Sequence, residues 1–199
     1  MELDRYDIFP NPIWMTTIEN IDLSSMKKYV LNLQKNDKND VQFSNKGGWQ
    51  SPATNIFPPY ESFSKLHNSI HISINKCIDY MDLGISLKLQ NYWFNVNEYG
   101  NYNDLHNHMG AIFSGVFYIN VPQEKAGNIK FQRDDDIDYY LPKLKNYNTV
   151  TGSSISYPPA NGKLYIFPGW LKHSVDANLS QELRISMSFN YGLEYITKI

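Results

Sequence analysis

The sequence has little of several features that would assign a protein to a broad class. Its single cysteine, Cys77, cannot form an internal disulfide, and its place in a helical apolar pattern favours a buried thiol. Neither sign of charge dominates, because 18 basic and 20 acidic residues give a net charge of −2. We therefore expect no general affinity for nucleic acid or for an anionic membrane.

Long hydrophobic runs are also missing. The N-terminus, Met1–Pro10, lacks the basic start and apolar stretch of a signal peptide, and the apolar run at Ala111–Val121 is interrupted and strand-like. We expect a cytoplasmic protein with no membrane partner. The 199 residues, 42% of them hydrophobic, predict one domain, and a homodimer is compatible with this composition.

The N-terminal half contains two segments with helical periodicity. Apolar residues recur at helical spacing from Met26 to Leu33, after Ser24, which we expect to cap this first helix. A second helix is predicted over Glu61–Met81, where the apolar face comprises Phe63, Leu66, Ile70, Ile74, Cys77, Ile78 and Met81. Between them, Lys35–Gln50 is predicted to be a loop near a ligand or partner, with Trp49 exposed.

From Leu87 onward the apolar period changes to alternation. The strand-like runs are Leu87–Tyr99, Ile112–Val121, Asn128–Gln132, Ser153–Tyr157, Leu164–Phe167, Ser174–Ala177 and Leu183–Tyr191. They predict a mainly β barrel or sandwich with two helices packed on one side. The acidic, Tyr-rich segment Arg133–Asn148 is either a solvated loop or a lid over a site.

Three histidines are candidate metal ligands. His106 and His108 are two residues apart, so in an extended strand both imidazoles point to the same face. A third, His173, follows a strand that ends in Pro168-Gly169, where the chain must turn. A second pair, His67 and His71, has helical ligand spacing but no neighbouring third ligand, which favours a structural role.

A polar stripe follows these histidines. In the strand that begins at Arg184, that residue alternates with apolar positions and shares one face with Ser186, Ser188 and Asn190. The interior of a small barrel is normally apolar. The stripe therefore indicates a ligand cavity or a solvent face.

The order of several motifs resembles the prolyl-4-hydroxylase-like 2-oxoglutarate/iron(II) oxygenases. They are Tyr99-Gly-Asn, His106-x-His108, Phe117-Tyr118-Ile119-Asn120, Gly127-Asn-Ile-Lys-Phe131, Gly162-x-Leu-x-x-Phe167-Pro168, His173 and Arg184-x-Ser186. The sequence is also similar to a group of these oxygenases from marine bacteria and phages with a Ser-Gly-Val-x-Tyr signature, here Ser114–Tyr118. The resemblance covers about Trp93–Tyr191. A phage-encoded protein would act in the host cytoplasm.

The resemblance implies a double-stranded β-helix (jelly roll) formed by residues 87–199, with residues 1–86 as helical and extended support in one oxygenase domain. It implies iron(II) as the metal, held by His106, His108 and His173. It also implies 2-oxoglutarate as the cosubstrate, bound by Arg184, Tyr118, Ser186 and Tyr99. The implied reaction hydroxylates a substrate while 2-oxoglutarate and O₂ become succinate and CO₂.

One position departs from the family pattern. The wider family has Asp or Glu where this chain has His108. Asp104 has the same strand parity as His106, so it is the alternative third ligand. Two other functions stay open: a three-His iron dioxygenase that does not use 2-oxoglutarate, and an inactive jelly-roll binding module. The primary substrate is not identified by any signature in the sequence.

Overall fold

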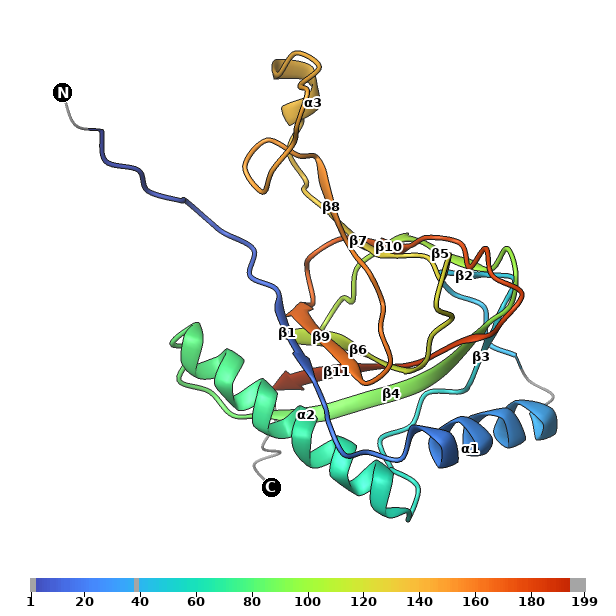
Figure 1. Ribbon diagram of the computed structural model, residues 1–199. Coiled ribbons are helices and arrows are strands. Elements are labelled where there is room, and N and C mark those ends of the chain that lie inside the picture. Colours follow the sequence, from blue (N-terminus) through green and yellow to red (C-terminus); the bar gives the residue numbers. More distant parts are fainter. Residues whose placement is uncertain (1–2, 38–39, 194–199) are drawn as a thin grey trace.

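The computed structural model describes residues 3–37 and 40–193 (Figure 1). Residues 38 and 39 of the predicted loop Lys35–Gln50 lie outside this part of the chain, as do the two ends of the predicted domain. The elements in chain order are β1 (Trp14–Thr17), α1 (Leu23–Asn36), β2 (Asn45–Lys46), β3 (Trp49–Gln50), α2 (Glu61–Tyr80), β4 (Leu87–Asn97), β5 (Tyr102–His106), β6 (Phe113–Asn120), β7 (Ile129–Gln132), α3 (Ile137–Tyr140), β8 (Ser154–Tyr157), β9 (Lys163–Pro168), β10 (His173–Val175) and β11 (Arg184–Leu193).

The strands form two antiparallel sheets that make a double-stranded β-helix. One sheet has the order β1-β9-β6-β11-β4-β3, and the other has the order β2-β5-β10-β7-β8. Strands that follow one another in the sequence often lie in different sheets, which is how the chain winds the jelly roll. The prediction of a mainly β fold is therefore confirmed.

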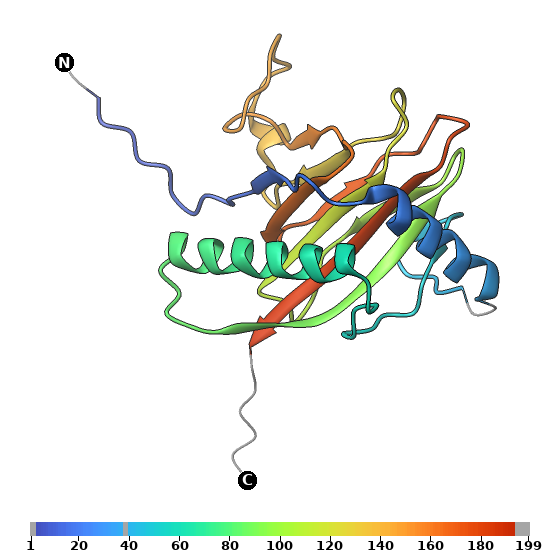
Figure 2. The same cartoon turned by 60° about the horizontal axis from the view of Figure 1, so that its bottom comes forward.

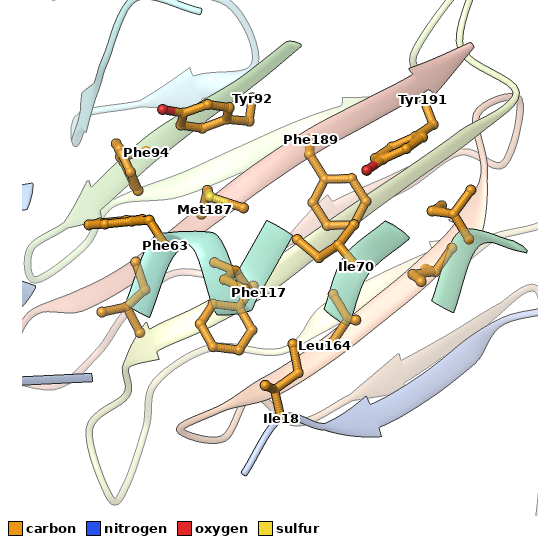
Figure 3. Close-up of a cluster of buried hydrophobic side chains, with 14 of the residues drawn as sticks. Ile18, Phe63, Ile70, Tyr92, Phe94, Phe117, Leu164, Met187, Phe189 and Tyr191 are labelled. Carbon is orange, nitrogen blue, oxygen red and sulfur yellow. The ribbon is translucent and has the colours of Figure 1, made fainter. Parts of the chain in front are cut away.

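Two helices cover the outer face of the six-stranded sheet (Figures 1 and 2). The apolar stripe of α2 packs against alternate residues of the sheet, and Figure 3 shows Phe63 and Ile70 beside Phe117, Met187 and Phe189. Burying each such side chain contributes roughly 1.5–3 kcal/mol. Cys77 lies in this layer with 1% of its surface exposed, and burial raises the pKa of its thiol to about 12, so the expectation of a buried thiol is confirmed.

The N-cap of the first helix lies two residues earlier than predicted. Asp22 is the N-cap, and its carboxylate accepts a hydrogen bond from the Ser25 backbone N–H at 3.0 Å. Ser24 lies inside the first turn, so the predicted cap was wrong. Aspartate and serine are both good N-caps, and the pattern alone did not distinguish them.

The predicted loop Lys35–Gln50 is only partly a loop. Its first residues extend α1 to Asn36, and its last residues form β2 and β3. Trp49 was predicted to be exposed but is 9% exposed, because the pairing of β3 with β4 places its indole in the helix-facing core. Its Nε1–H donates to Asp37 Oδ2 at 3.1 Å.

A long hairpin joins β7 to β8 and projects away from the sheets (Figure 1). It contains the short helix α3, whose Tyr139 and Tyr140 are 88% and 83% exposed. The segment Arg133–Asn148 is thus a solvated projection in this structure.

Candidate metal centre

The three candidate histidines meet between the two sheets. His106 ends β5 and pairs in register with His173, the first residue of β10, while His108 lies two residues beyond β5. The ring centroids of His106 and His173 are 4.3 Å apart, and those of His108 and His173 are 5.1 Å apart. One ligand nitrogen from each residue lies within 4.8 Å of the others, which is compatible with one shared metal ion.

Backbone carbonyls orient two of the imidazoles. His106 Nδ1 lies 2.7 Å from the Asp104 carbonyl oxygen, and His173 Nδ1 lies 2.9 Å from that of Leu171. A carbonyl only accepts hydrogen bonds, so each Nδ1 carries the proton and each Nε2 keeps its lone pair. His108 Nε2 is 3.3 Å from His173 Nε2, so the third imidazole also belongs to this compact group of nitrogens.

Burial keeps these imidazoles neutral. It lowers the pKa of His108 from 6.5 to about 4, with a smaller effect from His106. The pKa of His173 falls well below its ordinary value, first through burial and then through the other two histidines. The pKa of His106 is lowered by burial, against an opposing effect of the nearby Asp104. Neutral imidazole is the form that binds a metal.

Asp104, the alternative ligand, does not join this group. His106 pairs with His173, and Asn103 pairs with Val175. Between these two pairs the chain advances by three residues in β5 but by only two in β10. This extra residue is a β-bulge, and it breaks the strand parity that would have placed Asp104 beside His106. The Asp104 carboxylate instead lies 3.2 Å from Lys46 Nζ and is half-exposed.

The polar stripe of β11 faces the same cavity. Arg184, Ser186 and Ser188 line it together with the histidines. Ile185, Met187 and Phe189 point to the opposite face, where they belong to the core under the helices. Asn190 lies beyond the cavity lining and accepts a hydrogen bond from Ser114 at 2.7 Å.

Arg184 is a buried cation whose two terminal guanidinium nitrogens differ in their hydrogen bonds. The side chain is 1% exposed, and its Nη1 donates to the carbonyl oxygens of Ala126 and, at 2.9 Å, Asp176. Its Nη2 is buried and has no hydrogen-bond partner among the described residues. Burial lowers the pKa of Arg184, while Tyr118 and Asp176 oppose that shift. An unpartnered guanidinium N–H in a cavity is suited to a carboxylate ligand.

The remaining predicted cosubstrate residues separate into two groups. Tyr118 and Ser186 line the cavity, and burial raises the pKa of the Tyr118 hydroxyl, so this hydroxyl keeps its proton. Tyr99 is 59% exposed and is not part of the lining, because it lies in the tight turn between β4 and β5. The prediction that Tyr99 contacts the cosubstrate does not agree with this placement.

Sequence reasoning missed part of the lining. Trp93, Asn95 and Asn97 alternate along β4 beside the β11 stripe, with Asn97 opposite Arg184 and Asn95 opposite Ser186. Their period-two spacing was a usable signal. Ser44, from the segment before β2, also lines the cavity, and nothing in its sequence context marks it.

Together the donor set fits a transition metal and an anionic chelator. Three neutral nitrogen donors suit iron(II), and a buried cation in the same cavity suits a carboxylate of the chelating ligand. His67, by contrast, stacks on Phe57 with centroids 4.6 Å apart, which is a structural contact.

Comparison with known proteins agrees with this chemistry. The family described as "Putative 2OG-Fe(II) oxygenase" matches residues 91–190. No curated protein matches the chain. No helix within residues 3–37 and 40–193 has the length and apolarity needed to span a bilayer.

Solved structures share the fold at low identity. A prolyl-4-hydroxylase from Pseudomonas putida aligns with a TM-score of 0.63 and 13% identity over 92% of this chain and 94% of that one. HygX from Streptomyces hygroscopicus, solved with nickel and 2-oxoglutarate, aligns with a TM-score of 0.58 and 12% identity over 94% and 85%. A Trichoplax adhaerens prolyl hydroxylase, in complex with a hypoxia inducible factor peptide fragment, aligns with a TM-score of 0.58 and 12% identity over 90% and 83%.

Proposed function

Because the chain belongs to the family of 2-oxoglutarate- and iron(II)-dependent oxygenases, we propose that it hydroxylates a substrate while 2-oxoglutarate and O₂ become succinate and CO₂. The observation that carries this proposal is the set of side chains that line one cavity. This cavity holds three converging imidazoles and a buried arginine whose Nη2 has no hydrogen-bond partner within residues 3–37 and 40–193.

In this proposal His106, His108 and His173 hold iron(II). Bound iron supplies a centre at which the 2-oxo acid chelates and O₂ is activated. The protein's part is to present three nitrogens from one side, so that the opposite side stays open to ligands. The carbonyls of Asp104 and Leu171 fix two of those rings before any metal arrives.

Arg184 receives the distal carboxylate of 2-oxoglutarate. Its Nη1 is already held by backbone carbonyls, so the guanidinium is fixed and its Nη2 is available. Tyr118 keeps its phenolic proton and adds a second donor to this carboxylate, and Ser186 adds a third. Fixing one end of the cosubstrate orients its keto acid toward the histidines.

The charge of the site also favours a dianionic cosubstrate. Three neutral imidazoles leave the full charge of iron(II) uncompensated by protein, and Arg184 adds another positive charge. Described residues of the lining include no carboxylate. A ligand with two carboxylates offsets both charges in the low-dielectric cavity.

The test is an anaerobic titration of the protein with iron(II) and then with 2-oxoglutarate. Chelation produces a weak visible metal-to-ligand charge-transfer band. We expect it in the wild type and expect its loss in His106→Ala and Arg184→Ala. A wild type without the band, or a band that survives in both variants, contradicts the proposal.

A second function rests on the replacement of the usual carboxylate by His108. A three-His iron site that oxidises its substrate without 2-oxoglutarate would show O₂ consumption that is independent of this cosubstrate. Arg184 Nη2, which finds no partner in the described part of the chain, favours the first function. An inactive binding module would show no iron(II) affinity.

A further inference from the structure

The N-terminal segment adds a hydroxyl to the metal end of the cavity. Ser44 Oγ lies 3.5 Å from His106 Nε2, the ring nitrogen that is left free for a metal because Nδ1 bonds to the Asp104 carbonyl. Ser44 lies outside residues 91–190, the part of the chain that matches the oxygenase family. Nothing in that match therefore assigns it a role.

The position of Ser44 is fixed by its surroundings. Its carbonyl oxygen accepts from the Asp104 backbone N–H at 2.9 Å, and the next residue, Asn45, pairs in register with Asn103 across β2 and β5. The buried Asn45 amide donates to the Val41 carbonyl at 3.0 Å and also reaches the Gly48 carbonyl. Ser44 is thus held by a short strand and a closed turn.

The direction of the Ser44 proton follows from its neighbours. Asn103 Nδ2 donates to Ser44 Oγ at 3.2 Å, so this oxygen already acts as an acceptor on that side. His106 Nε2 has no proton, because Nδ1 donates to the Asp104 carbonyl. The proton of the Ser44 hydroxyl is therefore directed toward the lone pair of His106 Nε2, across a long contact of 3.5 Å.

A metal ion on His106 takes that lone pair. The hydroxyl then loses its acceptor, although Asn103 and the backbone still hold its oxygen beside the metal. We propose that Ser44 becomes a hydrogen-bond donor to an anionic or aqueous ligand bound to the metal next to His106. This inference rests on the proposed function, because it requires the histidines to hold a metal.

The proposal predicts that removing the Ser44 hydroxyl changes the affinity for the exogenous ligand but does not lower the affinity for the metal. Removing the hydroxyl takes away a group that competes with the metal for Nε2, so metal affinity does not fall. It also takes away a donor to the bound anion. A hydrogen bond to a charged group contributes about 1.5 kcal/mol or more, so anion affinity falls about tenfold.

The experiment titrates cobalt(II) into the full chain and then azide into the cobalt-loaded protein, following the visible bands of the metal. We expect Ser44→Ala to bind cobalt(II) as well as the wild type does and azide about tenfold more weakly. Ser44→Thr keeps the hydroxyl and should bind azide like the wild type.

Ser51→Ala is the matched control, since Ser51 is a buried serine of the same segment whose Oγ accepts from the Phe94 backbone N–H at 3.0 Å. It should leave both affinities unchanged.

The outcomes separate the two proposals. A wild type that binds no cobalt(II) overturns the proposed function and this inference with it. Cobalt(II) binding with equal azide affinity in the wild type and Ser44→Ala overturns the role of Ser44 alone. The same holds if the cobalt-loaded wild type takes up no azide, or if Ser44→Ala loses cobalt(II) affinity. Thermal unfolding of each variant shows whether the fold is intact.

Discussion

The ring of Phe189 occupies the space that a side chain at Gly115 would need. A Cβ added to Gly115 would lie 2.3 Å from Phe189 Cζ and 2.6 Å from the Tyr165 carbonyl oxygen. Gly115 pairs with Phe189 on one side and with Ile166 on the other, in the middle of the six-stranded sheet. The glycine of the Ser-Gly-Val-x-Tyr motif is therefore explained by packing.

We expect Gly115→Ala to destabilise the fold by about 1–3 kcal/mol, because overpacking in a closed core forces neighbours to move. Urea unfolding measures this change. Gly84→Ala is the control: Gly84 has a positive φ but nothing within 4 Å of an added Cβ, so strain at its backbone is the main cost. Combining Gly115→Ala with Phe189→Leu should recover part of the loss, and no recovery would argue against this packing explanation.

Much of the fold was predictable because its long elements have strong periods. The alternation of β11 placed Arg184, Ser186 and Ser188 on one face and the core residues on the other, as the structure does. The helix predicted over Glu61–Met81 matches α2 within one residue. These patterns are set by burial of one face, which the sequence records directly.

The parts that were not predictable depend on tertiary pairing. Trp49 lies within the two-residue strand β3, and Ser44 directly precedes the two-residue strand β2. Such strands are too short to have a period. The different directions of Asp104 and His106 come from a bulge whose extra residue is defined only by the partner strand. Tyr99 matched a family motif, yet a turn places it in solvent.

Substitution should lower the metal affinity at His108 but not at Asp104. His108→Ala removes a nitrogen of the group, so cobalt(II) affinity should fall by more than the roughly 10- to 100-fold typical of losing an outer-shell partner. Asp104→Asn should leave the affinity unchanged, because this carboxylate pairs with Lys46 outside the group. Calorimetric titration measures both. A large loss in Asp104→Asn would make the carboxylate a ligand after all.

Arg184→Gln should weaken 2-oxoglutarate binding at least about 30-fold, because truncating one partner of a buried charged pair costs about 2–5 kcal/mol. Cobalt(II) affinity should stay near that of the wild type, since Arg184 is not among the nitrogens that converge. Arg133→Gln is a matched control on an arginine outside the cavity lining. Equal 2-oxoglutarate affinity in Arg184→Gln and the wild type would exclude the proposed carboxylate contact.

The metal-free protein should lose stability on mild acidification. Burial lowers the pKa of His108 from 6.5 to about 4, so between these values the unfolded chain binds more protons than the folded one. Lowering the pH from 6.5 to 4 therefore lowers the free energy of unfolding. Raising the pH above 6.5 adds no further stability through this residue. Urea midpoints across this range measure the slope. His108→Gln should have a shallower slope, and identical slopes would mean that His108 is not desolvated.

The projecting hairpin should be dispensable for both ligands. Replacing residues 134–152 with an Asn-Gly turn removes mostly exposed side chains and surface ion pairs such as Lys172–Asp134, and each such pair contributes about 0–1 kcal/mol. Affinities for cobalt(II) and 2-oxoglutarate should match those of the full chain, with unfolding midpoints nearly equal. Weaker cosubstrate binding would instead support a lid.

The two outermost strands of the six-stranded sheet, β1 and β3, both come from the N-terminal half of the chain. They are four and two residues long, and they cover the free sides of β9 and β4. Without β3, the two residues of β4 that it pairs with, Asn95 and Val96, would offer unpaired backbone groups next to the buried Phe94. Such an edge recruits other chains by strand addition and leads to aggregation. The N-terminal half thus protects the barrel against edge-to-edge association, and a core expressed from Leu87 onward would lack that protection.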